Sequence, residues 1–184
     1  NSLDSKGFLT RSNFDINRVI KDTAATFEGT CNAKDIVLDL TFAADIQMVY
    51  ADLGKIQQVL YNLIDNAIKF SRENSVIYIQ TSLKYEKVFV SVKDTGIGIP
   101  AEAQEHIFER FYRVDKSHSR EIGGTGLGLA ITKNAITMHN GDIKVHSVLG
   151  EGTMFDVRIP LNYISPQNSA GSHKNRKQHK MVHD

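Results

Sequence analysis

One stretch, Lys55 to Ser71 (KIQQVLYNLIDNAIKFS), limits the possible folds more than any other part of the sequence. At 3.6 residues per turn its apolar side chains form one continuous stripe, which predicts a helix packed on a hydrophobic core. The apolar residues of this stripe are Ile56, Val59, Leu60, Leu63, Ile64, Ala67 and Ile68. A second stripe is polar and lies along one edge of the same helix. It consists of Gln58, Asn62, Asn66 and Lys69, a set that suits a hydrated cation and a phosphate group.

Length and composition predict one globular domain with ragged ends. The chain has 184 residues, of which 41% are hydrophobic, enough for one sizeable core and too few for two. Its single cysteine, Cys31, excludes an internal disulfide framework and fits a reducing compartment. No apolar run approaches the roughly 18 residues that cross a bilayer, and the N-terminus lacks a signal-peptide pattern. We therefore expect a cytoplasmic fragment without membrane contact.

Charge is distributed unevenly along the chain. The formal net charge is +1, but Lys174, Arg176, Lys177 and Lys180 all lie in the last twenty residues, so the globular part is slightly acidic. A nucleic-acid-binding domain would need a basic face, so we expect no nucleic-acid partner. Residues 163–184 are polar and poor in large apolar side chains, which predicts a disordered tail.

Short β-rich runs alternate with helical patterns along the rest of the chain. The expected strands are Ile36 to Phe42, Gln47 to Ala51, Val76 to Leu83, Lys87 to Lys93, Asp142 to Leu149 and Thr153 to Ile159, of which the last four form two hairpins. Further helices are expected from Phe14 to about Thr30, from Ala101 to Phe108 and from the glycine cluster near Gly124 to Asn140. Asp15 and Asp52 are expected as helix N-caps.

Strand alternation directs two polar side chains toward the core. Val88, Val90 and Val92 share one face of a predicted strand, and the same alternation turns Asp94 inward. Thr153 is likewise in phase with the apolar residues of the last strand. Because a carboxylate is rare among buried side chains, Asp94 is a candidate binding residue.

Three motifs follow the polar helix edge in order: DTGIGIP (Asp94–Pro100), IFERFYR (Ile107–Arg113) and GGTGLGLA (Gly123–Ala130). Gly96 and Gly98 permit close approach of the backbone to a ligand. The last motif opens a helix, whose N-terminal N–H groups can receive phosphate oxygens.

The glycine cluster fits neither of two commoner phosphate loops. A Walker A motif requires Lys and Ser or Thr where Leu129 and Ala130 stand, and GxGxxG fails at Leu129. The sequence therefore supports neither a P-loop nor a dinucleotide fold.

Together, the polar edge from Asn62 to Lys69 and these three motifs resemble the N, G1, F and G2 boxes of the ATP-binding catalytic domain of sensor histidine kinases. That domain belongs to an ATPase superfamily that also includes gyrase, Hsp90 and MutL. The resemblance implies an α+β fold of the Bergerat type, a two-layer sandwich with a mixed, largely antiparallel sheet of about five strands under about three helices and a mobile ATP lid. It places the catalytic domain at residues 14–162, after a residual linker, 1–13, from a missing phosphoacceptor hairpin.

The resemblance also implies residue roles at the phosphate end of bound ATP. Asn66 matches the asparagine whose oxygen holds Mg²⁺, Asn62 the second asparagine near metal and phosphates, and Lys69 a phosphate-contacting lysine, so these three are the catalytic candidates. Arg113 is similar to a phosphate-contacting arginine of the lid. The cluster implied to receive phosphate oxygens is Gly124, Thr125, Gly126, Leu127 and Gly128.

At the adenine end, the resemblance implies that Asp94 accepts a hydrogen bond from the exocyclic amine. Gly96 and Gly98 match glycines whose backbone runs against the nucleotide. Thr153 either assists adenine through its hydroxyl or a bridging water, or is a buried strand threonine bonded to backbone. Phe108, Phe111 and Tyr112 are expected to anchor the start of the lid by packing.

Asn62 distinguishes phosphoryl transfer from hydrolysis within the superfamily. Hydrolysing relatives carry a glutamate one turn before the metal asparagine as general base for water, and an asparagine cannot take up a proton usefully. The sequence therefore resembles the branch that donates the γ-phosphate of Mg·ATP to a histidine. None of the seven histidines stands in the family's acceptor context.

The implied partners are the chain's own phosphoacceptor domain, absent here, and a response regulator downstream of the full kinase. The fragment is expected to be monomeric, with its parent tethered to a membrane or sensor module. Two alternatives stay open on the sequence: a serine kinase or ATPase of the anti-sigma-factor type, and a non-catalytic nucleotide-binding interaction module.

Overall fold

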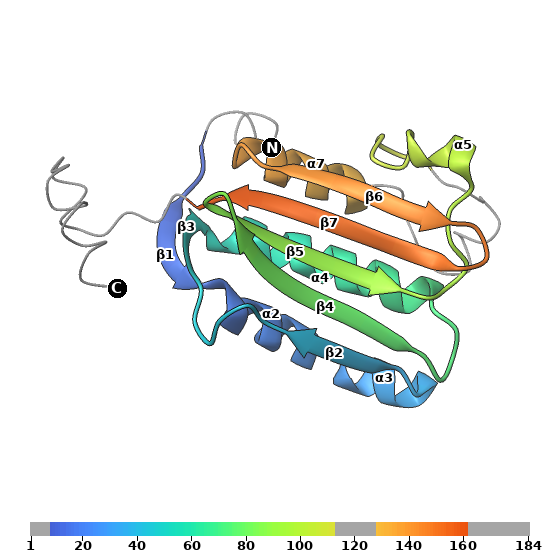
Figure 1. The fold of residues 1–184 in the computed structure, drawn as a ribbon. Coiled ribbons are helices and arrows are strands. Elements are labelled where there is room, and N and C mark those ends of the chain that lie inside the picture. The colour runs from blue at the N-terminus through green and yellow to red at the C-terminus, as the bar shows by residue number, and fades with distance from the viewer. Residues whose placement is uncertain (1–7, 113–127, 162–184) are drawn as a thin grey trace, which may run out of the picture.

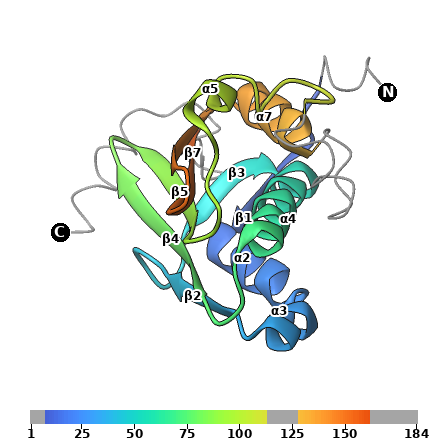
Figure 2. The same ribbon diagram turned by 90° about the vertical axis from the view of Figure 1, so that its right-hand side faces the viewer.

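The structure is a computed structural model that describes residues 8–112 and 128–161. It has two layers, a five-stranded sheet and a set of helices that cover one of its faces (Figures 1 and 2). The strands are β1 (Arg11–Asp15), β2 (Val37–Thr41), β3 (Met48–Asp52), β4 (Val76–Lys84), β5 (Lys87–Asp94), β6 (Asp142–Val148) and β7 (Gly152–Pro160). The helices are α2 (Ile16–Ala25), α3 (Glu28–Lys34), α4 (Leu53–Phe70), α5 (Ala101–Gln104) and α7 (Gly128–Met138).

The main sheet has the strand order β2-β4-β5-β7-β6. Only β2 and β4 pair in parallel, and the other three pairs are antiparallel. This mixed, largely antiparallel sheet under helices confirms the predicted α+β fold class. A separate antiparallel pair joins β1 to β3. Strand β1 begins at Arg11, which lies inside the range 1–13 that the sequence suggested as linker.

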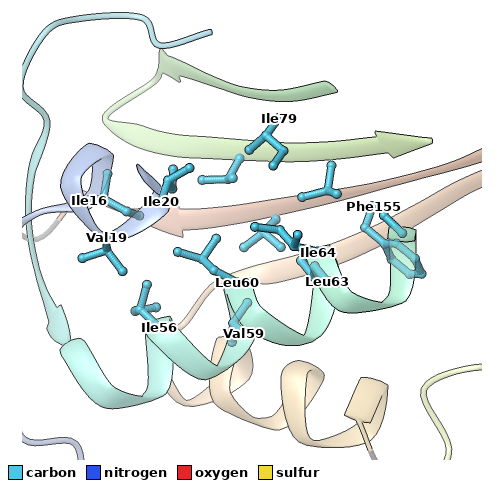
Figure 3. Packing of buried hydrophobic residues seen from close by; sticks show 14 of the residues in the cluster. Ile16, Val19, Ile20, Ile56, Val59, Leu60, Leu63, Ile64, Ile79 and Phe155 are labelled. Atoms are coloured by element: carbon cyan, nitrogen blue, oxygen red, sulfur yellow. The ribbon is translucent and has the colours of Figure 1, made fainter. Parts of the chain in front are cut away.

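The central helix α4 confirms the prediction made from the sequence pattern. All seven residues of its apolar stripe are buried. Figure 3 labels five of them, which lie near Ile79 of β4, Phe155 of β7 and three side chains of α2. Burying each large aliphatic side chain contributes about 1.5–3 kcal/mol, so this contact fixes which edge of α4 stays polar. The N-cap is Asp52, whose Oδ1 accepts the N–H of Lys55 at 3.1 Å.

The helix predicted from Phe14 to about Thr30 is wrong as one element. Phe14 belongs to β1, and α2 starts after the N-cap Asp15, whose carboxylate accepts the N–H of Asn17. Helix α2 ends at Ala25 because the N–H and hydroxyl of Thr26 both donate to the carbonyl of Thr23, which tightens the last turn. Helix α3 then starts at Glu28.

The helix predicted from Ala101 to Phe108 is shorter than expected. Helix α5 ends at Gln104, and the chain continues to Tyr112 in turns. Backbone N–H groups there bond three residues back, as in the contacts of His106 with Ala103 and of Glu109 with His106. Such tight turns replace the last part of the expected α-helix and continue into the F-like motif.

A buried histidine joins the ends of two helices. His139, which is 0% exposed, follows α7. Its Nδ1 donates to the Ala135 carbonyl at 2.7 Å, and its Nε2 accepts the backbone N–H of Asp52 at 3.0 Å. Because a carbonyl only accepts and an N–H only donates, the imidazole is neutral with its proton on Nδ1. Burial, followed by nearby positive charge from Arg11 and Lys55, lowers the pKa of His139 below 6.5, against the opposing effects of Ala135 and Asp52.

The lowered pKa of His139 predicts a loss of stability in mild acid. Since the unfolded chain takes up this proton near pH 6.5 and the folded chain only at lower pH, stability should fall as the pH drops below 6.5. His139→Gln should flatten this part of the profile and lower stability at neutral pH by about 1–3 kcal/mol, because buried partners lose a contact. Urea unfolding across this pH range measures both effects. His146→Gln, at an exposed position on β6, is the matched control. The same pH slope in wild type and His139→Gln would contradict the prediction.

Candidate functional site

The polar edge of α4 lies on one unbroken helix, so Asn62 and Asn66 are stacked one turn apart, as the sequence predicts. Both are half-buried. Lys69 is engaged on the helix itself, because its Nζ lies 3.0 Å from Oδ2 of Asp65. The carboxylate of Asp65, which precedes Asn66, is thus paired with an ammonium one turn later on the same helix.

Asn62 connects this edge to the start of α7. Its Nδ2 donates to the carbonyl oxygen of Gly128 at 3.3 Å and lies 3.4 Å from Oγ1 of Thr132. The structure therefore brings together the N-box edge and the last glycine of the cluster, which lie far apart in sequence. The remaining predicted residues of this end, Arg113, Gly124, Thr125, Gly126 and Leu127, lie outside the described residues, as does the predicted lid.

Asp94 lies at the end of β5 with its side chain turned inward, as the strand alternation predicts, and is 4% exposed. Its Oδ1 accepts the N–H of Gly96 at 2.8 Å. Burial raises the pKa of Asp94 above 3.8, and backbone hydrogen bonds from Gly96 and Thr153 oppose that rise. A buried carboxyl group with remaining acceptor capacity is a binding group for a neutral N–H donor.

The glycines of DTGIGIP are required by packing against protein backbone. A Cβ on Gly96 would lie 2.0 Å from the carbonyl oxygen of Phe70, at the end of α4. A Cβ on Gly98 would lie 2.3 Å from the carbonyl oxygen of Val148, and Gly98 also has a φ of +75°. The loop therefore connects the end of α4 to the β6–β7 hairpin at the Asp94 end of the site. Contact of these glycines with a nucleotide stays a prediction.

Hydrogen bonds of the β6 and β7 hydroxyl groups hold this loop. Ser147 of β6 lies 2.8 Å from the hydroxyl of Thr153, and its own Oγ accepts the N–H of Ile99 at 2.8 Å. Thr153 is buried with its side chain inward, as predicted. The amide of Gln104 donates to the carbonyl oxygens of Ile99 and Ser147. Sequence reasoning missed Ser147 and Gln104, because neither is part of a recognisable motif.

Two of the three aromatic residues in the F-like motif pack as expected. Phe108 lies edge-on to Phe155 with ring centroids 6.2 Å apart, and Tyr112 also packs against the core cluster. Phe111 does not, since it is 68% exposed with a φ of +66°. The expectation that all three side chains pack is therefore wrong for Phe111, because its backbone conformation turns the ring away from the core.

The described residues offer neither a ready-made metal cage nor a membrane span. Within residues 8–112 and 128–161, no group of three or more His, Cys, Asp or Glu side chains could hold a metal ion. In the same ranges no helix combines the length and the hydropathy that a membrane span requires. A carboxamide oxygen such as that of Asn66, together with a ligand's phosphates, is a set of oxygen ligands that suits a divalent cation.

Comparison with known proteins identifies relatives of this chain. Residues 51–163 match the family described as "Histidine kinase-, DNA gyrase B-, and HSP90-like ATPase". The chain is 35% identical over 149 residues to the circadian input-output histidine kinase CikA of Synechococcus elongatus, covering 80% of this chain and 20% of that protein. It is 46% identical over 114 residues to the sensor histidine kinase WalK of Bacillus subtilis, covering 61% of this chain and 19% of that protein. The chain thus spans about a fifth of the length of these relatives.

Solved structures show the same fold. The catalytic domain of histidine kinase ThkA, in a nucleotide-free form, matches with a TM-score of 0.74 and 33% identity, covering 83% of this chain and 97% of that chain. Full-length ShkA in complex with AMPPNP matches with a TM-score of 0.74 and 29% identity, covering 84% of this chain and 32% of that chain. ThkA in complex with the response regulator protein TrrA matches with a TM-score of 0.70 and 31% identity, covering 83% of this chain and 42% of that chain.

The close backbone contacts of Gly96 and Gly98 predict that alanine is not tolerated there. Gly96→Ala and Gly98→Ala should each lower the free energy of unfolding by more than 2 kcal/mol, on the order expected for forced backbone shifts and strain. Gly29→Ala is the matched control, because a Cβ there meets nothing within 4 Å and the position is helical. It should raise stability by about 0.5–1 kcal/mol. Urea unfolding measures the free energy of unfolding of all three variants. A urea midpoint of Gly98→Ala equal to that of wild type would refute the packing argument.

Proposed function

Because this chain belongs to the histidine kinase-, DNA gyrase B- and HSP90-like ATPase family, as the catalytic, ATP-binding domain of a histidine kinase, we propose that it binds Mg·ATP and donates the γ-phosphoryl group to a histidine on a separate phosphoacceptor domain. The observation that carries the proposal is the contact of Asn62 with the start of α7. This contact joins the polar edge of α4 to the helix that follows the glycine cluster.

The buried carboxyl group of Asp94 supports adenine as the base. An acceptor held in an apolar surrounding binds the exocyclic amine of adenine, which has two N–H donors. Guanine has a carbonyl oxygen at the corresponding position, so two acceptors would face each other without a proton between them. We propose that this contact selects adenine, with the Ser147–Thr153 hydroxyl pair behind it.

The carboxamides and the ammonium on α4 support a phosphate and metal end one to two turns from Asn62. Asn66 is half-buried, and its side chain forms no hydrogen bond with another described residue, so its oxygen fits a divalent cation. Mg²⁺, when bound, would supply positive charge to the oxygens of the transferring phosphoryl group. Lys69 would exchange its contact with Asp65 for a phosphate oxygen. The N-terminus of α7 would direct N–H groups and the helix dipole to the same anion.

The surroundings of Asn62 favour transfer over hydrolysis. A carboxamide does not take up a proton near neutral pH, and its amide nitrogen is already bonded to Gly128. The carboxylate nearest in sequence to Asn66, that of Asp65, is paired with Lys69. We therefore propose that this edge positions reactants and does not activate water.

The proposed acceptor and the next partner lie beyond this chain. ThkA, one of the structural relatives, has been solved together with a response regulator protein. By this likeness we propose that the parent kinase passes its phosphoryl group from a histidine to a response regulator. The catalytic domain alone would then bind nucleotide as a monomer and need a phosphoacceptor domain to turn over.

Asp94→Asn should separate nucleotide binding from stability. Loss of a charged acceptor should lower affinity for ATP and ADP about 10- to 100-fold by calorimetry. Burial raises the pKa of Asp94, so ionising this carboxyl group costs the folded protein stability as the pH rises from 3.8 through the higher folded pKa. Asparagine carries no charge and avoids this cost. The nucleotide-free Asp94→Asn variant should therefore be as stable as wild type at neutral pH, or more stable. Asp39→Asn, on an exposed part of β2, is the control.

The same pKa shift predicts weaker nucleotide binding in acid. Wild-type affinity should fall as the pH drops toward the raised pKa of Asp94, and Asp94→Asn should lack this dependence. An unchanged affinity in Asp94→Asn at neutral pH would exclude Asp94 as the adenine acceptor.

Asn66→Ala should remove the metal-dependent part of function. Affinity for ADP in EDTA should stay within about twofold of wild type. The gain in affinity on adding Mg²⁺ should be lost, because changing even a residue that only supports a metal ligand typically costs about 10- to 100-fold in metal affinity. Mixing wild type with an acceptor hairpin from a relative and labelled ATP should give acid-labile phosphohistidine, which Asn66→Ala should not form. Phosphoserine on the partner, or steady hydrolysis without it, would instead indicate one of the other activities of the superfamily.

A further inference from the structure

Thr132 is a buried polar residue of α7 that none of the sequence motifs includes. It lies one turn after Gly128 and is 0% exposed. Its hydroxyl donates to the carbonyl oxygen of Gly128 at 2.9 Å. The Nδ2 atom of Asn62 reaches the same hydroxyl and the same carbonyl, at 3.4 and 3.3 Å. These three groups form a closed polar contact between α4 and α7, which lie side by side in both ribbon views (Figures 1 and 2).

The chemistry of this contact fixes the orientation of the Asn62 carboxamide. The Gly128 carbonyl can only accept a hydrogen bond. The Thr132 hydroxyl uses its one proton on that carbonyl, so it also presents a lone pair to Asn62. Two acceptors therefore face the carboxamide, and only its NH₂ group can satisfy them. Because the two acceptors are themselves only 2.9 Å apart, one N–H of this group can be shared between them.

This orientation decides what Asn62 offers to a ligand. With Nδ2 held against α7, Oδ1 is on the opposite side of the carboxamide, and no described residue donates to it. Asn66 follows one turn later on the same edge. An oxygen acceptor attracts the water of a hydrated cation or an ammonium group and repels phosphate oxygens. A carboxamide turned by 180° would do the reverse and bind phosphate directly.

We propose that Thr132 is a positioning residue that holds the Asn62 carboxamide with its oxygen toward the nucleotide, and thereby makes ATP binding respond to the divalent cation. The inference rests on the proposed Mg·ATP function and deepens it. Thr132 acts through Asn62 and touches neither adenine nor phosphate. Its hydroxyl should therefore affect the metal-dependent part of ATP affinity and leave the metal-independent part unchanged.

The test compares Thr132→Val, which keeps the shape and removes the hydroxyl, with Thr132→Ser, which keeps the hydroxyl. Calorimetry gives the ATP affinity in Mg²⁺ and in EDTA. Thr132→Val should reduce the gain in ATP affinity that Mg²⁺ gives by about three- to tenfold, the usual value of one hydrogen bond. The ATP affinity measured in EDTA should stay within about twofold of wild type. Thr132→Ser should restore the wild-type gain. In an Asn62→Ala background, Thr132→Val should have no further effect, because the group through which it acts is missing.

A second measurement needs no nucleotide. The side-chain NH₂ resonances of Asn62, assigned by NMR in the free protein through their loss in Asn62→Ala, should shift in Thr132→Val and return in Thr132→Ser. Unchanged resonances would overturn the inference.

Three outcomes of the calorimetry would also overturn the inference: a wild-type Mg²⁺ gain in Thr132→Val, equal impairment of the Val and Ser variants, or additive effects with Asn62→Ala. If wild type itself shows no Mg²⁺-dependent ATP binding, the proposed function fails, and the NMR comparison alone decides whether Thr132 orients Asn62.

Discussion

The burial of one face of α4 against the sheet is the contact on which the rest of the molecule depends. Because an α-helix has 3.6 residues per turn, burying one stripe of apolar side chains fixes the direction of every other side chain on the helix. The direction in which Asn62 and Asn66 leave the helix therefore follows from the packing of the opposite face. The hydrophobic core, to which each large side chain contributes about 1.5–3 kcal/mol, sets the rotation of the helix and with it the geometry of the site.

Three buried polar residues form hydrogen bonds between elements whose relative position apolar packing alone would not fix. His139 connects the end of α7 to the start of α4, and Thr132 connects the start of α7 to the middle of α4. Asp94 connects β5 to the loop that follows it. A buried polar group costs about 1–3 kcal/mol when it lacks a partner, so each contact tolerates little displacement. Two of these contacts lie on α7, which is thereby fixed to α4 near both of its ends.

Local pattern predicted much of the fold and only part of the site. Periodicity of 3.6 found α4, and alternation found the two hairpins and the inward direction of Asp94 and Thr153, because these depend on neighbours within one element. The break between α2 and α3 depends on Thr26 bonding its own backbone, which competes with a continuing helical pattern. The contacts of Thr132 and His139 come from helices far apart in sequence, so no local pattern contains them. The sequence predicted that Gly96 permits close approach to a ligand, whereas its close contact with the carbonyl oxygen of Phe70 is visible only in three dimensions.

The pairing of β5 with β7 has a consequence for how lengths can vary along this chain. Asp94 lies opposite Thr153, so the last residue of β5 and the second residue of β7 close a long connection that contains α5, α7 and β6. The entropy of closing a flexible loop grows only with the logarithm of its length, about 0.6 kcal/mol for each doubling. Insertions between α5 and α7 would therefore cost the folded state little, provided that the two strands keep their register. The sheet therefore fixes the two ends of this connection, and the length of chain between α5 and α7 can vary at small thermodynamic cost.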